Sequence, residues 1–161
     1  MTLHRFTFIL GSVLLLFCLP AGALFAQQSR DMKGWDMESP YNQLYDANEL
    51  DDFKGVVKKV YTAIPMPGMS PAVVMDVAES EDAVNTVHIC PTWFRDPEAI
   101  GIRRGDKIKV KGVWAEIDGN FIFMAAKVKK GDYFEFKVRV TSDGTPFWTL
   151  SPAQQAMHSN N

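Results

Sequence analysis

The chain has 161 residues, with 17 Lys or Arg against 19 Asp or Glu, so its formal net charge is −2 at neutral pH. This acidic balance argues against a general nucleic-acid-binding protein, because such a protein needs a basic excess to displace counterions from phosphates. The length is right for one domain with a modest hydrophobic core.

Residues 1–26 have the layout of a cleaved secretory signal peptide. A short positive start leads into the apolar run 6–19, and small residues follow, so cleavage is expected after Ala23 or after Ala26. The run is shorter than the roughly 18 apolar residues that a transmembrane helix needs. We therefore expect a periplasmic or secreted protein with no membrane span after cleavage.

The chain has two cysteines, and the signal peptide would remove Cys18 and leave Cys90 alone. In an oxidising compartment, a lone thiol is buried, bound to a metal, or paired with another molecule.

Three segments follow the signal peptide. Residues 27–50 show no regular period and are expected to be a linker with an irregular piece, in which Asp46 or Asn48 caps a turn. Residues 51–150 carry the folded domain. The polar tail, 151–161, is expected to be disordered.

Six stretches of the folded domain are rich in β-forming residues or alternate between apolar and polar residues, which predicts six strands. A short helix over 92–102 is expected between the third and fourth strands, because Asp96-Pro97-Glu98 resembles a helix start. The strands are expected at 53–61, 72–78, 83–90, 107–114, 120–128 and 133–140.

The strand sequences also contain a turn signal and a row of lysines. Asp118-Gly119 is a strong hairpin signal, and Arg139 falls on the polar side of the last strand. The fourth strand carries three alternating lysines that could meet an anionic partner, although a solvated strand face that discourages edge pairing explains them equally well. These are Lys107, Lys109 and Lys111.

A helix between the third and fourth of five or six strands is the layout of an OB-fold, a small Greek-key barrel whose faces and loops bind ligands. The predicted fold class is therefore mainly β, an OB-fold-like Greek-key barrel of five to six strands with one short helix between strands 3 and 4. A plain β-sandwich is the alternative.

Several short motifs in a fixed order resemble a group of small exported bacterial OB-fold-like proteins. They are Phe53-Lys54-Gly55-Val56-Val57, Val87-His88-Ile89, Pro91-x-Trp93-Phe94, Gly105-Asp106-Lys107-Ile108-x-Val110-x-Gly112, Ala125 to Val128, Gly131-Asp132 and Pro146-x-Trp148. A more distant likeness is to the periplasmic bacterial OB-fold family linked to stress tolerance. The resemblance spans about residues 41–148 and implies no enzymatic activity. Cys90 stands where those relatives tend to have glycine.

His88 and Cys90 are the sharpest candidate site. On an extended strand they point to the same face, and an imidazole and a thiolate can both bind copper or zinc. Met66 and Met69 could add thioether ligands that favour Cu(I). The alternative is that His88 bonds a neighbouring carbonyl while Cys90 packs as a small buried side chain. No Cys-x-x-Cys-His motif for covalent haem attachment is present.

Aromatic residues are the second candidate, because OB-folds stack ligands on them. Trp93, Trp114 and Trp148 could contact a ligand together with His88 and Cys90, although a small barrel also needs aromatic side chains for its core.

Catalysis finds little support, since the folded part offers one histidine and no nucleophile motif. We therefore predict an exported binding or interaction module of the cell envelope that is not an enzyme, has no cofactor, and acts as a monomer or weak oligomer. Its partner would be a small ligand or an envelope protein. A periplasmic copper, zinc or redox accessory protein is the first alternative, and a docking subunit of a larger envelope complex is the second.

Overall fold

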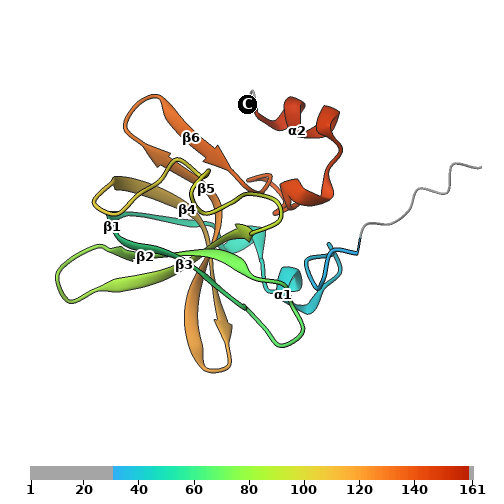
Figure 1. The fold of residues 1–161 in the computed structure, drawn as a ribbon, viewed down its shortest axis with the longest axis horizontal. Helices are drawn as coiled ribbons and strands as arrows, with labels where there is room; N and C mark the ends of the chain where they lie inside the picture. The colour runs from blue at the N-terminus through green and yellow to red at the C-terminus, as the bar shows by residue number, and fades with distance from the viewer. Residues whose placement is uncertain (1–30, 160–161) are drawn as a thin grey trace, which may run out of the picture. The chain divides into compact units, whose positions relative to one another are not determined.

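A computed structural model describes residues 31–159 (Figure 1), so the predicted signal peptide at 1–26 and its cleavage site lie outside the described residues. The described part is mainly β, and the six predicted strands are confirmed. They are β1 (Asp51–Ala63), β2 (Ala72–Ala78), β3 (Val84–Pro91), β4 (Lys107–Ile117), β5 (Asn120–Lys130) and β6 (Phe134–Lys137). Two short α-helices, α1 (Pro40–Gln43) and α2 (Pro152–Ser159), lie outside the strands, as do the 3-10 turns η1 (Ala47–Glu49) and η2 (Phe147–Thr149).

The strands form one sheet in the order β3-β2-β1-β4-β5-β6, with antiparallel neighbours. In addition, β3 pairs in parallel with β5, where Val87 lies opposite Phe123 and His88 opposite Met124. The run of pairings from β3 through β2, β1 and β4 to β5 therefore comes back to β3. Strand β6 extends the sheet beyond β5.

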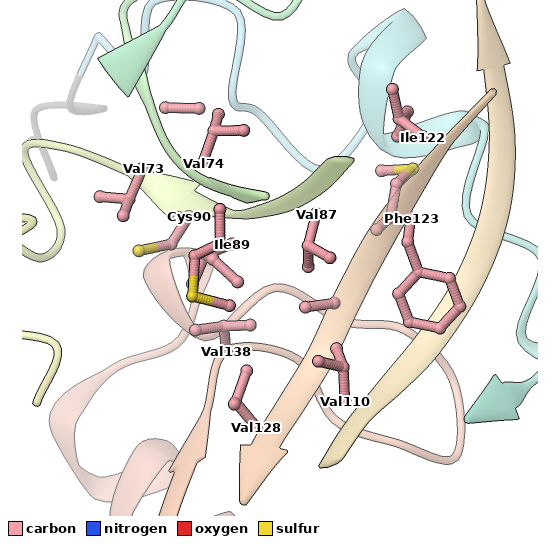
Figure 2. Close-up of a cluster of buried hydrophobic side chains, with 14 of the residues drawn as sticks. Val73, Val74, Val87, Ile89, Cys90, Val110, Ile122, Phe123, Val128 and Val138 are labelled. Carbon is pink, nitrogen blue, oxygen red and sulfur yellow. The ribbon is translucent and has the colours of Figure 1, made fainter. Parts of the chain in front are cut away.

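The core consists of the inward side chains of these strands, which meet between β3 and β5 (Figure 2). Alternation along β4 buries Ile108 and Val110 while the lysines between them stay at the surface. Phe123 of β5 is fully buried, and burial of such a ring stabilises the fold by roughly 1.5–3 kcal/mol. At Gly112, where the β4–β5 register shifts, a Cβ would overlap the carbonyl of Met124. Only glycine lets the two backbones come this close.

The helix predicted over 92–102 is wrong in detail, because these residues form a series of turns. The amides of Phe94 and Arg95 both donate to the carbonyl of Pro91, and a separate turn joins Ala99 to Asp96. The apolar residues of the segment lie at its two ends, and each end forms its own turn. No continuous apolar stripe is left to stabilise a helix, and a helix this short is marginal without one.

The ends of the described chain are more ordered than the sequence predicts. Asp46 caps the turn η1 by accepting from the amide of Asn48 at 2.9 Å, as expected. The tail predicted to be disordered forms α2, which begins with a capping box: the amide of Ser151 donates to Gln154 Oε1 at 2.9 Å, and the Ser151 hydroxyl accepts from the amide of Gln154 at 3.4 Å. Neither helix of residues 31–159 is long and apolar enough to cross a membrane.

Candidate functional site

His88 and Cys90 lie at a bulge in β3. His88 pairs with Val74 and Cys90 with Val73, so Ile89 is an extra residue that interrupts the alternation of the strand. Every residue from Val87 to Cys90 is buried. The bulge therefore turns the candidate pair into part of the interior instead of leaving it on an open strand face.

The imidazole of His88 is held by the phenol of Tyr41, with 3.2 Å between Nδ1 and Oη. The rings of the two residues also stack at 6.0 Å. Burial lowers the pKa of His88 to about 4 because a charged imidazolium loses its hydration there. At neutral pH His88 is therefore an uncharged, hydrogen-bonded core residue that is 8% exposed.

The thiol of Cys90 is free and fully buried, and Figure 2 shows it among Val73 and Ile89. Burial raises the pKa of the Cys90 thiol to about 12, although the charge of Arg95 works in the opposite direction. Metal ligation and nucleophilic attack both require the thiolate. Cys90 is accordingly suited to packing.

The two methionines proposed as further metal ligands lie in the loop between β1 and β2. The amide of Met69 donates to the carbonyl of Met66 at 3.1 Å, which closes a turn. Met69 is buried and packs against Gly34, a residue whose φ is positive. Among residues 31–159, no cluster of three or more His, Cys, Asp or Glu side chains could hold a metal ion.

Two of the predicted ligand-binding tryptophans serve the fold. Trp148 is 5% exposed and donates from Nε1 to the carbonyl of Trp35 at 2.9 Å. The two indoles meet edge to face at 5.4 Å. Trp93 is half-buried, and its Nε1 donates to the Ser70 hydroxyl at 3.1 Å.

Arg139 is the buried polar residue that the sequence reasoning missed. The amides of Val138 and Arg139 both donate to the carbonyl of Ala126, at 2.8 and 3.0 Å, which marks a second bulge. The bulge turns the Arg139 side chain inward, where it is 2% exposed. A signal for this bulge is not visible in the alternation of the strand.

The guanidinium of Arg139 joins the two ends of the domain. Its Nη2 donates to Asn42 Oδ1 at 2.7 Å, and its Nη1 donates to the carbonyl of Gly144 at 3.1 Å. It also lies over the rings of Tyr45 and Trp148, at 4.8 and 5.0 Å, where cation–π attraction offsets part of the desolvation cost. Burial lowers the pKa of Arg139, while Tyr41 and Tyr45 raise it.

Among the predicted ligand-contacting residues, Trp114 is the most exposed, at 37%. It lies on β4 opposite Phe123 of β5, and its ring packs edge to face on Phe123 at 4.9 Å and stacks on Phe53 at 6.1 Å. Its Nε1 donates to Asp51 Oδ2 at 3.1 Å. These contacts fix the indole while leaving one side of it in solvent.

Phe121 continues the same face toward the tip of the β4–β5 hairpin. It precedes Phe123 by two residues on β5, so both rings lie on one side of the strand, and it is 71% exposed. The hairpin, drawn in orange, extends away from the other strands (Figure 1). Its turn is formed by Asp118 and Gly119, both with positive φ, as the sequence predicts. We call Trp114 and Phe121 the hairpin aromatics.

Comparison with known proteins adds one finding. A model described as the MamS/MamX magnetosome protein family matches residues 49–134, more than half of the chain. The matched range runs from the end of η1 to the start of β6 and includes the hairpin aromatics. No curated protein matches the chain.

Proposed function

Because the chain belongs to the MamS/MamX magnetosome protein family, we propose that it is a magnetosome-associated interaction module and not an enzyme. It docks onto a protein partner through the hairpin aromatics, Trp114 and Phe121. The observation that carries the proposal is the exposure of Phe121, which is 71% open to solvent beside a tryptophan that is already held in place.

The physical argument rests on what these two rings would gain. Phenylalanine and tryptophan are enriched in protein interfaces, where a few aromatic side chains carry most of the binding energy. Trp114 is preorganised by Asp51, Phe53 and Phe123, so docking costs it little side-chain entropy. A hairpin tip that extends from the sheet can also reach a groove on a partner.

The fold suits such a role. We propose that the sheet is an OB-fold-like Greek-key barrel, a proposal supported by the parallel β3–β5 pairing that links the two ends of the run β3-β2-β1-β4-β5. OB-folds bind their ligands on strand faces and loops. Export to the periplasm through the predicted signal peptide at 1–26 is part of the same proposal.

The alternative of a copper, zinc or redox accessory protein has no observation in its favour. Its main residues, His88 and Cys90, are buried. Burial raises the pKa of the Cys90 thiol, which keeps it protonated, and the neutral imidazole of His88 already forms a hydrogen bond with Tyr41 through Nδ1.

Fractionation of magnetosome-forming cells tests the proposal. A tagged chain is expected to co-purify with magnetosomes, and the variant Trp114→Ser/Phe121→Ser is expected to lose this association while keeping its thermal unfolding midpoint within a few degrees. The matched control, Ile64→Ser/Met157→Ser, removes two other exposed apolar side chains and should behave as the parent does. Retention of the hairpin variant in the magnetosome fraction would contradict the docking role.

A further inference from the structure

One face of the sheet carries two rows of lysines that run across the strands. In the first row, Lys54 of β1 lies directly opposite Lys109 of β4, and Lys109 lies opposite Lys129 of β5. In the second row, Lys111 of β4 lies opposite Lys127 of β5. Lys107 continues the pattern two residues before Lys109. We call these six residues the lysine face: Lys54, Lys107, Lys109, Lys111, Lys127 and Lys129.

Two carboxylates offset part of this charge. Asp52 pairs with Lys109 at 2.8 Å, and Glu135 pairs with Lys129 at 2.8 Å and with Lys127 at 3.7 Å. The hydrogen bond from Lys109 holds the pKa of Asp52 below its usual range. Six lysines and two carboxylates leave the face with a net charge of +4 in a chain whose formal charge is −2.

The remaining three lysines are less closely compensated. Lys111 lies directly opposite Asp52 on β1, and the charges of Lys111 and Lys54 both act on that carboxylate, but neither lysine pairs with it. Among the described residues, Lys54, Lys107 and Lys111 form no ion pair. Like charges directly across a strand pair destabilise a sheet. Placing these charges together therefore lowers the stability of the sheet, which suggests that the lysines serve a purpose other than folding.

Protection of a sheet edge does not explain the rows. Lysines on an edge strand discourage pairing with another chain, but β1, β4 and β5 are each hydrogen-bonded on both sides. The β4 lysines form a strand face at the surface, as the sequence predicts, but β4 is not an edge strand, so the part of that prediction that concerns edge pairing is wrong.

The surface between the rows is hollowed and open. A hollow of about 500 Å³ beside the first row is lined by Lys54, Lys107, Lys109 and Lys129, and also by the acidic Asp132. A second, of about 290 Å³, lies between Asp52, Lys109, Lys111, Lys127 and Lys129. Neighbouring lysines are spaced by about 5 Å across the strands and about 7 Å along them. The charges thus form a two-dimensional array instead of a single pocket.

We propose that the lysine face binds the surface of a membrane that contains anionic phospholipids. Lysine carries a compact charge on a flexible stem, which suits diffuse attraction to many phosphates, whereas arginine provides bidentate recognition of one group. The face contains no arginine. A planar array of ammonium groups matches a planar array of lipid phosphates, and each lysine near such a surface adds to the affinity.

Other anionic partners fit the face less well. A single-stranded nucleic acid calls for aromatic side chains between the cations, and the two rows have none. An acidic peptide would occupy one line of charges and leave the other row unpaired. The membrane proposal does not depend on the hairpin aromatics, so either proposal can fail without the other.

Sedimentation with lipid vesicles tests the inference, using the full chain as the cell processes it. Vesicles with 30% phosphatidylglycerol in phosphatidylcholine are expected to bind the protein, and pure phosphatidylcholine vesicles are not. The variant Lys54→Gln/Lys107→Gln/Lys111→Gln should bind about 100-fold more weakly, and added salt should weaken binding of the parent protein because exposed charges are screened.

A charge-matched control separates position from net charge. Lys33→Gln/Lys59→Gln/Arg95→Gln also removes three exposed positive charges but leaves the lysine face intact, so it should bind within about threefold of the parent. The thermal unfolding midpoint of the lysine-face variant should be unchanged or slightly higher, because repulsion between neighbouring lysines is removed.

Three outcomes would overturn the proposal. They are equal weakening by both triple variants, binding to phosphatidylcholine as strong as to the anionic vesicles, and binding to poly-glutamate or free polyphosphate without binding to the anionic vesicles.

Discussion

Two regions of this domain place their polar and reactive side chains in opposite surroundings. Around β3 and the chain ends, His88, Cys90 and Arg139 are buried. His88 forms a hydrogen bond with Tyr41, and Arg139 donates to Asn42 and to the carbonyl of Gly144. On β4 and β5, the lysines lie at one surface of the sheet, and Phe121 at the hairpin tip is 71% exposed beside Trp114. The residues whose chemistry is rarest are thus the structural ones, and the ordinary lysines and aromatics are the ones available to a partner.

The contrast has a physical origin in the two bulges. Each bulge adds one residue to a strand and changes which side the following side chain takes. At Ile89 and at Val138 this brings polar side chains into the interior, where each must find a partner or cost the fold free energy. On β4, the alternation up to the register shift at Gly112 keeps Lys107, Lys109 and Lys111 at the surface.

The largest expected effect is a difference in the loss of stability when two tryptophans, one buried and one partly exposed, are replaced by alanine. Trp148→Ala should lower the free energy of unfolding by about 4 kcal/mol, because it leaves a cavity and removes the ring beneath Arg139. Trp114→Ala should cost about 1 kcal/mol, since its ring is partly exposed. Urea titrations of both variants measure the difference. Equal losses would remove the distinction between the buried and the open side.

The second prediction concerns pH and His88. The folded pKa of about 4 lies below the ordinary value of 6.5, so the unfolded chain binds a proton that the folded one refuses. Stability is therefore full above pH 6.5, falls as the pH drops toward 4, and the total loss is about 3 kcal/mol.

Unfolding titrations between pH 7 and pH 4 measure this slope. His88→Asn should flatten it, whereas His158→Gln, which changes the partly exposed histidine of α2, should leave it in place. A slope that survives His88→Asn would mean that other groups carry the pH dependence.

A smaller effect is expected for the partner of that histidine. Tyr41→Phe keeps the ring but removes the hydroxyl that meets His88 Nδ1 at 3.2 Å. One buried ring nitrogen then lacks a partner, which should cost about 1.5 kcal/mol. The exposed phenol of Tyr133 provides the matched control, because Tyr133→Phe should change the unfolding free energy by less than about 0.5 kcal/mol.

The smallest effect is expected at the thiol. Cys90→Ala removes one buried sulfur and should destabilise the fold by only about 1 kcal/mol. Metal content, measured by mass spectrometry after purification, should not change. A stoichiometric copper or zinc ion that disappears in this variant would instead support the accessory-protein alternative.

Much of the fold could be predicted from the sequence. Runs of β-forming residues and alternation identified the six strands, and Asp118-Gly119 identified the β4–β5 turn, because these signals are local. The capping box of α2, Ser151 with Gln154, was also present in the sequence, but the polar composition of the tail concealed it. The helix over 92–102 was predicted from a start signal with no apolar stripe to support it.

The candidate site was harder to predict, for reasons that are not local. His88 and Cys90 share a strand face only if β3 is regular, and its bulge at Ile89 arises from pairing with β2. The burial of Arg139 depends on Asn42, almost a hundred positions away in the chain. Likewise, the lysine rows appear only when β1, β4 and β5 are placed in register.

Hydroxyl-radical footprinting is the most direct test that the protein binds its partner through the hairpin aromatics. The protein is oxidised alone and while bound to isolated magnetosomes, and the labelled side chains are read by mass spectrometry. We expect protection at Phe121 and Trp114, with Ile64 and Met157 oxidised equally in both states, since all four are exposed in the free protein. Unchanged oxidation of Phe121 together with protection of Ile64 or Met157 would contradict this account.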